Sequence, residues 1–147
     1  MNPMREKYKA LLHDIGIHIE YYDHHIHGFY LILNGRIDGL TNAERLAIAY
    51  LVGSHRELGI KNRMLEHENI LSKNEINRLG RCVVLLNLAE QLDRTERGLI
   101  KEFKFEIGEN TLNLTLISDE DVSIERVSAL RLAERFEKQF DLTLNIM

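Results

Sequence analysis

The sequence predicts an α+β fold, in which a mainly helical bundle is followed by a small antiparallel β-β-α-β unit. Up to Gly98, apolar residues recur at intervals of three and four positions, and two capping boxes mark helix starts. After Gly98 the apolar residues alternate along the chain, which is typical of strands, before a helical period returns. We therefore divide the chain at Gly98 into a bundle, residues 1–98, and the β-β-α-β unit, residues 99–147.

Four helices are predicted in the bundle. They cover about residues 3–15, 25–34, 41–57 and 72–95. The first two are followed by Gly16 and Gly35, and glycine is suited to the C-terminus of a helix. Thr41 and Ser72 begin the last two, and each is followed three residues later by a glutamate, which completes a capping box.

The second part changes period twice. Apolar residues alternate over residues 100–107 and again over residues 112–116, with Gly108 in the short connection, and this pattern predicts a β-hairpin. A helical period then covers residues 123–140, and a final strand covers residues 142–146.

The composition indicates a soluble globular chain. Its 147 residues are 44% hydrophobic and 29% charged, which is enough for a real core. The net charge of -4 argues against a general nucleic-acid binder. Cys82 is the only cysteine, so no disulfide can form within the chain and we expect a cytoplasmic location. No signal peptide or apolar run of membrane-spanning length is present, so we expect no membrane partner.

Histidines are concentrated at the start of the chain, where six of the seven lie at or before His55. His13 and Asp14 are adjacent, and three more histidines follow within residues 24–27. A neutral imidazole nitrogen and an ionised carboxylate oxygen are both ligands for divalent metals. The His-Asp pair therefore forms half of a predicted metal site.

Five short motifs occur in a fixed order along the chain. They are Ala-Leu-Leu-His-Asp-Ile-Gly at residues 10–16, Tyr-Tyr-Asp-His-His-Ile-His at 21–27, Gly-Leu-Thr at 39–41, Ser-His-Arg at 54–56 and Leu-Ala-Glu-Gln-Leu-Asp-Arg at 88–94. In this order they resemble the C-terminal part of exopolyphosphatases and guanosine-pentaphosphate phosphatases, the Ppx/GppA family. The resemblance covers nearly the whole chain, and it implies an HD-like bundle that lacks the upstream helices of the family.

The predicted metal site consists of His13, Asp14, His27, His55 and Asp93. His27, His55 and Asp93 interrupt or extend an apolar face, where an unpaired polar group costs about 1–3 kcal/mol and needs a partner. Imidazole and carboxylate together suit Mn, Fe, Zn or Mg, and a nitrogen-rich set favours the transition metals. The alternatives are a histidine satisfied within the core and, for Asp93, an ion pair with Arg97.

The ordered set also resembles that of metal-dependent HD-domain phosphohydrolases, in which the His-Asp pair and a late aspartate bind metal. Those enzymes carry a further ligand histidine well upstream, whereas this sequence begins 12 residues before His13. His24, His25 or another chain would have to supply that nitrogen.

Arginine and lysine are frequent in the middle of the sequence, and the planar donor fork of arginine suits phosphate. Such charges usually form a solvated face. The resemblance implies instead that this module lines the passage for a long anionic substrate, so Arg56, Lys61 and Arg94 are predicted to bind phosphate.

In the family, hydrolysis belongs to two preceding actin-like ATPase domains, which this sequence does not contain. We therefore expect a domain that binds polyphosphate or a phosphorylated guanosine nucleotide in support of a phosphatase. The candidate protein partners are a second copy of the chain and actin-like phosphatase domains on another chain. Two alternatives stay open: a stand-alone metal-dependent HD phosphohydrolase, and a dimerisation or regulatory module with a vestigial metal site.

Overall fold

The computed structural model describes residues 12, 14–55 and 69–147. The chain forms two compact units, residues 1–83 and 84–147, and the division falls within helix α5 (Lys73–Leu92). The second unit thus includes the end of α5 together with the region predicted as a β-β-α-β unit. Apart from residues 12, 14 and 15, the first predicted helix lies outside the described residues.

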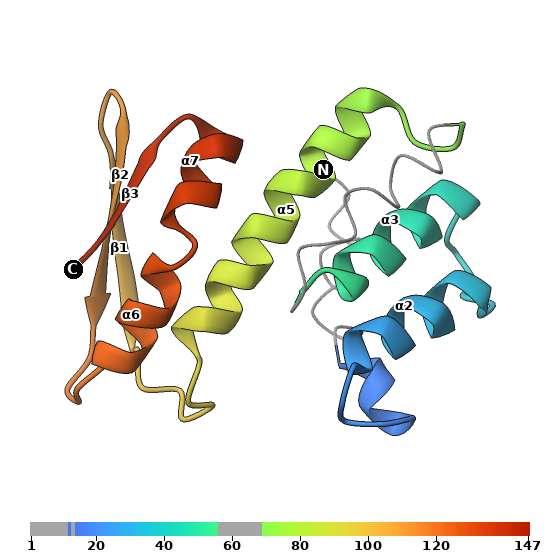
Figure 1. The fold of residues 1–147 in the computed structure, drawn as a ribbon, viewed down its shortest axis with the longest axis horizontal. Coiled ribbons are helices and arrows are strands. Elements are labelled where there is room, and N and C mark those ends of the chain that lie inside the picture. Colours follow the sequence, from blue (N-terminus) through green and yellow to red (C-terminus); the bar gives the residue numbers. More distant parts are fainter. Residues whose placement is uncertain (1–11, 13, 56–68) are drawn as a thin grey trace. The chain divides into compact units, whose positions relative to one another are not determined.

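The first unit contains a short 3-10 helix, η1 (Ile15–His18), and two helices that lie side by side, α2 (His24–Asn34) and α3 (Asn42–Gly53) (Figure 1). The second predicted helix is confirmed within one residue. The third ends at Gly53, earlier than the predicted residue 57, and the chain beyond residue 55 lies outside the described part until residue 69.

Both predicted capping boxes are present. The Glu44 backbone N–H donates to the Thr41 hydroxyl at 3.2 Å, and the Glu44 carboxylate accepts the Thr41 backbone N–H at 2.9 Å. Ser72 and Glu75 make the same exchange at 3.3 and 2.9 Å. Because each box satisfies backbone donors that a helix leaves unpaired, the starts of α3 and α5 are fixed by local sequence.

The core of the first unit lies against α3. Tyr50 is fully buried, and its ring lies 5.4 Å from that of Phe29 on α2. A second buried group joins α2 to α3 through Ile32, Ile48 and Val52. This apolar packing holds the start of α2 and the end of α3 in fixed positions, and these are the places where the buried histidines lie.

The second unit contains a three-stranded sheet in the order β1-β2-β3. The predicted hairpin is confirmed: β1 (Glu102–Ile107) pairs antiparallel with β2 (Thr111–Ile117). The final strand β3 (Thr143–Ile146) pairs in parallel with β2, so the sheet is mixed rather than wholly antiparallel as predicted. The two helices between β2 and β3 form a crossover that returns the chain to the end of the sheet from which β2 starts.

The predicted helix over residues 123–140 is two helices, α6 (Ser123–Leu130) and α7 (Ala133–Phe140). At the break, Arg131 and Leu132 donate their backbone N–H groups to carbonyls three residues earlier, at 3.3 and 3.0 Å, in place of the α-helical bonds. The break lets both helices cover one face of the sheet (Figure 1), where Phe136 is buried in one apolar cluster with Leu144 and Ile146.

Helix α5 is the longest described helix, with 20 residues, and ends at Leu92 rather than near the predicted residue 95. It carries charged residues in its sequence Lys-Asn-Glu-Ile-Asn-Arg-Leu. None of the described helices is both long and apolar enough to cross a lipid bilayer.

A hydrogen bond joins the loop after α5 to α6, and its loss tests the packing of the second unit. The Thr95 hydroxyl donates to the Glu125 carboxylate at 2.5 Å, and Glu125 is only 2% exposed. We expect Thr95→Val to lower the free energy of unfolding by about 1–3 kcal/mol, because a buried acceptor loses its donor. Thr95→Ser keeps the hydroxyl and serves as the control in urea unfolding.

The same pair predicts a pH dependence. The Thr95 hydroxyl, and to a lesser degree the Arg97 charge, hold the pKa of Glu125 below its ordinary value against the effect of burial. The stabilisation is therefore fully present above the unfolded pKa of about 4.3 and is lost as the pH falls through the folded pKa. The difference between wild type and Thr95→Val should shrink in acid. A difference that grows on acidification would contradict this account.

Candidate metal centre

Three side chains of the first unit converge on one point: Asp14, His24 and His55. The Nε2 atoms of the two histidines lie 2.9 Å apart. Asp14 Oδ1 lies 3.2 Å from Nε2 of His24 and 3.8 Å from Nε2 of His55. Both histidines are fully buried, whereas the Asp14 side chain is 47% exposed. The cluster is thus closed on the imidazole side and open to solvent on the carboxylate side.

Each member comes from a different place in the chain. Asp14 immediately precedes η1, His24 is the first residue of α2, and His55 lies two residues beyond the end of α3. His24, Gly28 and Ile32 recur every four residues and are all buried, so they share the inner face of α2. His25 is also buried, with its ring at 6.2 Å from those of His24 and His55 and nearly perpendicular to both.

Gly16 brings Asp14 close to His24. A Cβ atom at Gly16 would lie 1.8 Å from the His24 carbonyl oxygen and 2.6 Å from the Gly28 backbone nitrogen. Real Cβ atoms do not approach backbone atoms so closely, so only glycine allows η1 to pack directly on the first turn of α2. The close approach of the two backbones places the carboxylate two residues before Gly16 beside the imidazole of His24.

Backbone carbonyls fix the tautomers of both histidines. Nδ1 of His24 donates to the Tyr21 carbonyl oxygen at 2.9 Å, and Nδ1 of His55 donates to the Val52 carbonyl oxygen at 2.6 Å. A carbonyl oxygen has no proton to give, so each Nδ1 must carry one. In a neutral imidazole the other nitrogen is then an acceptor only. Two acceptor nitrogens and a carboxylate oxygen therefore face one another.

Such a convergence of acceptors can hold a cation. A proton that makes one ring an imidazolium satisfies the contact, and so does a metal ion. In tetrahedral coordination with metal–nitrogen distances of about 2.0–2.1 Å, two imidazole nitrogens lie about 3.3 Å apart. The two Nε2 atoms, now 2.9 Å apart, would therefore have to separate by only a few tenths of an ångström. Metal-binding histidines usually donate their second ring N–H to a carbonyl, as both do here. The donor set therefore fits a divalent metal.

The cluster contains two of the five predicted metal ligands, Asp14 and His55. His27 is half-buried on α2 and lies outside the cluster, and His13 lies outside the described residues. Asp93 belongs to the second unit, where it is exposed just beyond α5 and its Oδ1 accepts the Gly98 backbone N–H at 3.2 Å. The assignment of these three residues as ligands stays a prediction.

Of the three predicted phosphate-binding residues, the structure describes only Arg94. Arg56 and Lys61 lie outside the described residues. Arg94 is exposed in the turn after α5. Arg97, the alternative ion-pair partner predicted for Asp93, pairs instead with Glu120 at 2.8 Å.

His24 was not among the five predicted ligands and was named only as a possible source of the missing upstream nitrogen. In the structure the turn is made by Asp23, which adopts the left-handed conformation with φ 55°, and α2 starts one residue earlier than predicted. The spacing of His24, Gly28 and Ile32 is the signal that could have placed this histidine on the buried face.

The fold and the cluster define a helical unit with a candidate His-Asp metal centre, joined to a unit with a small mixed sheet. Residues 5–140 match the family model described as Ppx/GppA phosphatase, domain III. This match covers most of the chain, and the chain therefore belongs to the Ppx/GppA phosphatase family.

Curated relatives agree with this assignment. Proteins named guanosine-5'-triphosphate,3'-diphosphate pyrophosphatase from Pseudoalteromonas atlantica and Aeromonas hydrophila are both 34% identical to this chain, over 106 and 112 residues. The protein of the same name from Aeromonas salmonicida is 33% identical over 134 residues. These matches cover 71%, 76% and 90% of this chain but only 20%, 22% and 26% of the relatives. The chain thus corresponds to about a quarter of their length or less.

The cluster predicts that divalent metal stabilises the protein. At a free Zn or Mn concentration of 100 times Kd, we expect a gain of about 2.7 kcal/mol, which a thermal-unfolding scan detects and EDTA reverses. His24→Ala and His55→Ala should lose the metal-dependent increase in Tm whatever their stability without metal. His27→Ala removes a predicted ligand that lies outside the cluster, and it should keep the increase. An equal increase in the His24→Ala and His55→Ala variants would exclude the cluster as the metal site.

Gly16→Ala tests the position of the carboxylate. The added methyl must push η1 away from α2, so the unfolding free energy should fall by about 1–3 kcal/mol, as in other overpacked sites. Because Asp14 moves with η1, the metal-dependent increase in Tm should also become smaller. His18→Ala changes an exposed residue of the same element and is the matched control. Full retention of both stability and metal response in Gly16→Ala would refute the proposed contact.

Proposed function

We propose that this chain is a phosphatase-associated domain that binds polyphosphate or a phosphorylated guanosine nucleotide in support of phosphate hydrolysis. Membership of the Ppx/GppA family is the observation that carries the proposal. The curated relatives are named for guanosine-5'-triphosphate,3'-diphosphate, a ligand with two phosphate chains, and this supports a phosphorylated guanosine nucleotide.

The metal centre provides a reason for phosphate to bind here. Without metal, a proton shared between the facing ring nitrogens balances the charge of Asp14, so the cluster has no net positive charge to attract an anion. A divalent ion held by Asp14, His24 and His55 would give the site a net positive charge and offer open coordination positions to phosphate oxygens. The half-exposed side of Asp14 is the side from which an anion can approach.

Arginine and lysine would extend the contact along the ligand. Arg56 and Lys61 follow His55 closely in the sequence, and Arg94 remains exposed. A guanidinium offers paired donors to a phosphate, so Arg56 and Lys61 are proposed to bind phosphates beyond the one at the metal. Arg94 is proposed to bind phosphate in the second unit.

A second candidate is a metal-dependent phosphohydrolase in its own right. The observation that favours it is the small protein donor set, because catalytic metal sites keep coordination positions open for water or substrate. His13 and His27, which belong to the same unit, would then be further ligands of the site. The two candidates share the metal centre but differ in whether the chain itself releases phosphate.

Metal-dependent binding of nucleotide tests the proposal. In calorimetric titration of the whole chain, guanosine-5'-triphosphate,3'-diphosphate and polyphosphate should bind with Mn or Zn present and bind much more weakly with EDTA. Asp14→Asn should weaken the metal-dependent binding, whereas His18→Ala should not. Affinity should fall as salt rises, because arginine and lysine contacts to phosphate are screened.

Binding that is absent with metal, or equal with metal and with EDTA, would overturn the proposal. Phosphate release measured on the same samples separates the two candidates. Binding without turnover supports the associated domain, and metal-dependent turnover that Asp14→Asn abolishes supports the hydrolase.

A further inference from the structure

The first strand of the sheet leaves an apolar face uncovered. Phe103 is 48% exposed, and Phe105 and Ile107 are each 68% exposed. Across the hairpin these three residues pair with Leu116, Leu114 and Leu112. Cross-strand partners lie on the same face of a sheet, so the apolar face that α6 and α7 cover over β2 and β3 continues, without cover from the described residues, onto β1.

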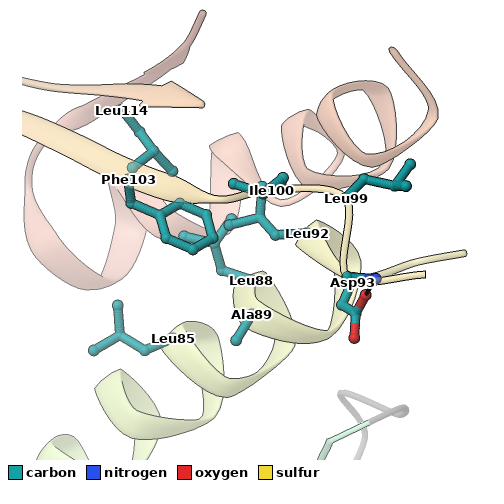
Figure 2. A pocket seen from close by; sticks show the side chains of 10 residues that line it. Leu85, Leu88, Ala89, Leu92, Asp93, Leu99, Ile100, Phe103 and Leu114 are labelled. Atoms are coloured by element: carbon teal, nitrogen blue, oxygen red, sulfur yellow. Dashed lines mark hydrogen bonds between the residues drawn. The ribbon is translucent and has the colours of Figure 1, made fainter. Parts of the chain in front are cut away.

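The exposed apolar face of β1 continues into an apolar groove. Figure 2 shows Phe103 above Leu85 and Leu88 of α5, in an open groove of about 530 Å³ that lies entirely within the second unit. Its lining is almost wholly apolar, with Asp93 as the one charged residue. The apolar surface therefore extends from α5 to the outermost strand, and such surfaces in soluble proteins mark contact sites.

The outer edge of β1 carries backbone groups that can pair with another strand. The Gly108 N–H donates to the Thr111 carbonyl at 2.8 Å, so the backbone groups of the even-numbered residues of β1 face β2. By alternation, those of Phe103, Phe105 and Ile107 face outward. β1 is an edge strand in the sheet order, and no strand of the described chain pairs with this edge.

The charges on β1 are self-complementary about Phe105. If two copies of β1 pair antiparallel with Phe105 opposite Phe105, Lys104 of each copy lies opposite Glu106 of the other, and Phe103 lies opposite Ile107. Sliding the pair by one step of two residues puts Lys104 opposite Lys104, or Glu106 opposite Glu106. Both side chains are exposed, and neither makes an ion pair within the described chain. One register alone therefore combines opposite charges with apolar contact.

We propose that β1 is a self-association edge: two copies of this chain join antiparallel through Phe103, Phe105 and Ile107 to form one continuous six-stranded sheet. Outward backbone groups make the hydrogen bonds, the exposed aromatic rings cover one another on the helical face, and the Lys104–Glu106 pairs on the other face fix the register. A second copy is the occupant because the strand complements its own charge sequence. The contact is small, so the dimer is concentration-dependent.

Charge reversal on the polar face gives a test that leaves the apolar face intact. Sedimentation velocity of the whole chain should show a reversible monomer–dimer equilibrium in the wild type. Lys104→Glu alone places four glutamates in contact, and Glu106→Lys alone places four lysines in contact. Each should weaken self-association at least about tenfold, because two attractive cross-strand pairs become repulsive.

Two further samples test the proposed register of the two β1 strands. An equimolar mixture of the Lys104→Glu and Glu106→Lys proteins should form a heterodimer, and the variant that carries both changes should recover self-association. Circular dichroism and the thermal unfolding of each variant should match the wild type, since both positions are exposed. A wild type that stays monomeric, single variants that dimerise like the wild type, or a mixture that fails to associate would each overturn the proposal.

Discussion

The described part of the first unit is organised around a contact that two neutral imidazoles cannot make unaided. Nε2 of His24 lies 2.9 Å from Nε2 of His55, while each Nδ1 is committed to a backbone carbonyl. In neutral rings neither of these two nitrogens carries a proton, so a cation between or beside them stabilises the contact, and the carboxylate of Asp14 is placed to hold it. The same three side chains could serve as ligands to a metal.

The surrounding packing explains how the chain sustains that contact. Apolar residues of α2 and α3 fix the two helices that present the histidines, and Gly16 lets the preceding turn approach closely enough to add the carboxylate. The second unit is packed differently. Helices α6 and α7 cover the face of the sheet over β2 and β3, whereas the edge strand β1 keeps an exposed apolar face and a self-complementary row of charges. One unit thus carries the candidate chemistry, and the other carries a candidate surface for association.

Local signals in the sequence predicted much of the fold, because they act over a few residues. The capping boxes at Thr41 and Ser72 and the hairpin around Gly108 were all confirmed. Two features that depend on distant packing were not foreseen. The helical period over residues 123–140 gives no sign of the break at Arg131 and Leu132, and strand alternation cannot tell whether β3 runs parallel or antiparallel to β2.

The site was predicted only in part for a similar reason. His55 was predicted to lie on an apolar face, and it is fully buried. His24 was harder to identify, because the left-handed residue Asp23 makes α2 start one position earlier than predicted and so places His24 on the buried face of the helix. For Asp93 the helical spacing extended past the point where α5 ends, so a residue expected on an apolar face lies exposed in the following turn.

Ring-nitrogen NMR of the histidines before and after addition of one equivalent of Zn tests the central claim most directly. The account predicts that His24 and His55 both keep the proton on Nδ1, and that only their Nε2 resonances move to the values of metal-bound imidazole. A proton found on Nε2 of either ring in the zinc-loaded protein, or Nε2 resonances that zinc leaves unchanged, would contradict it.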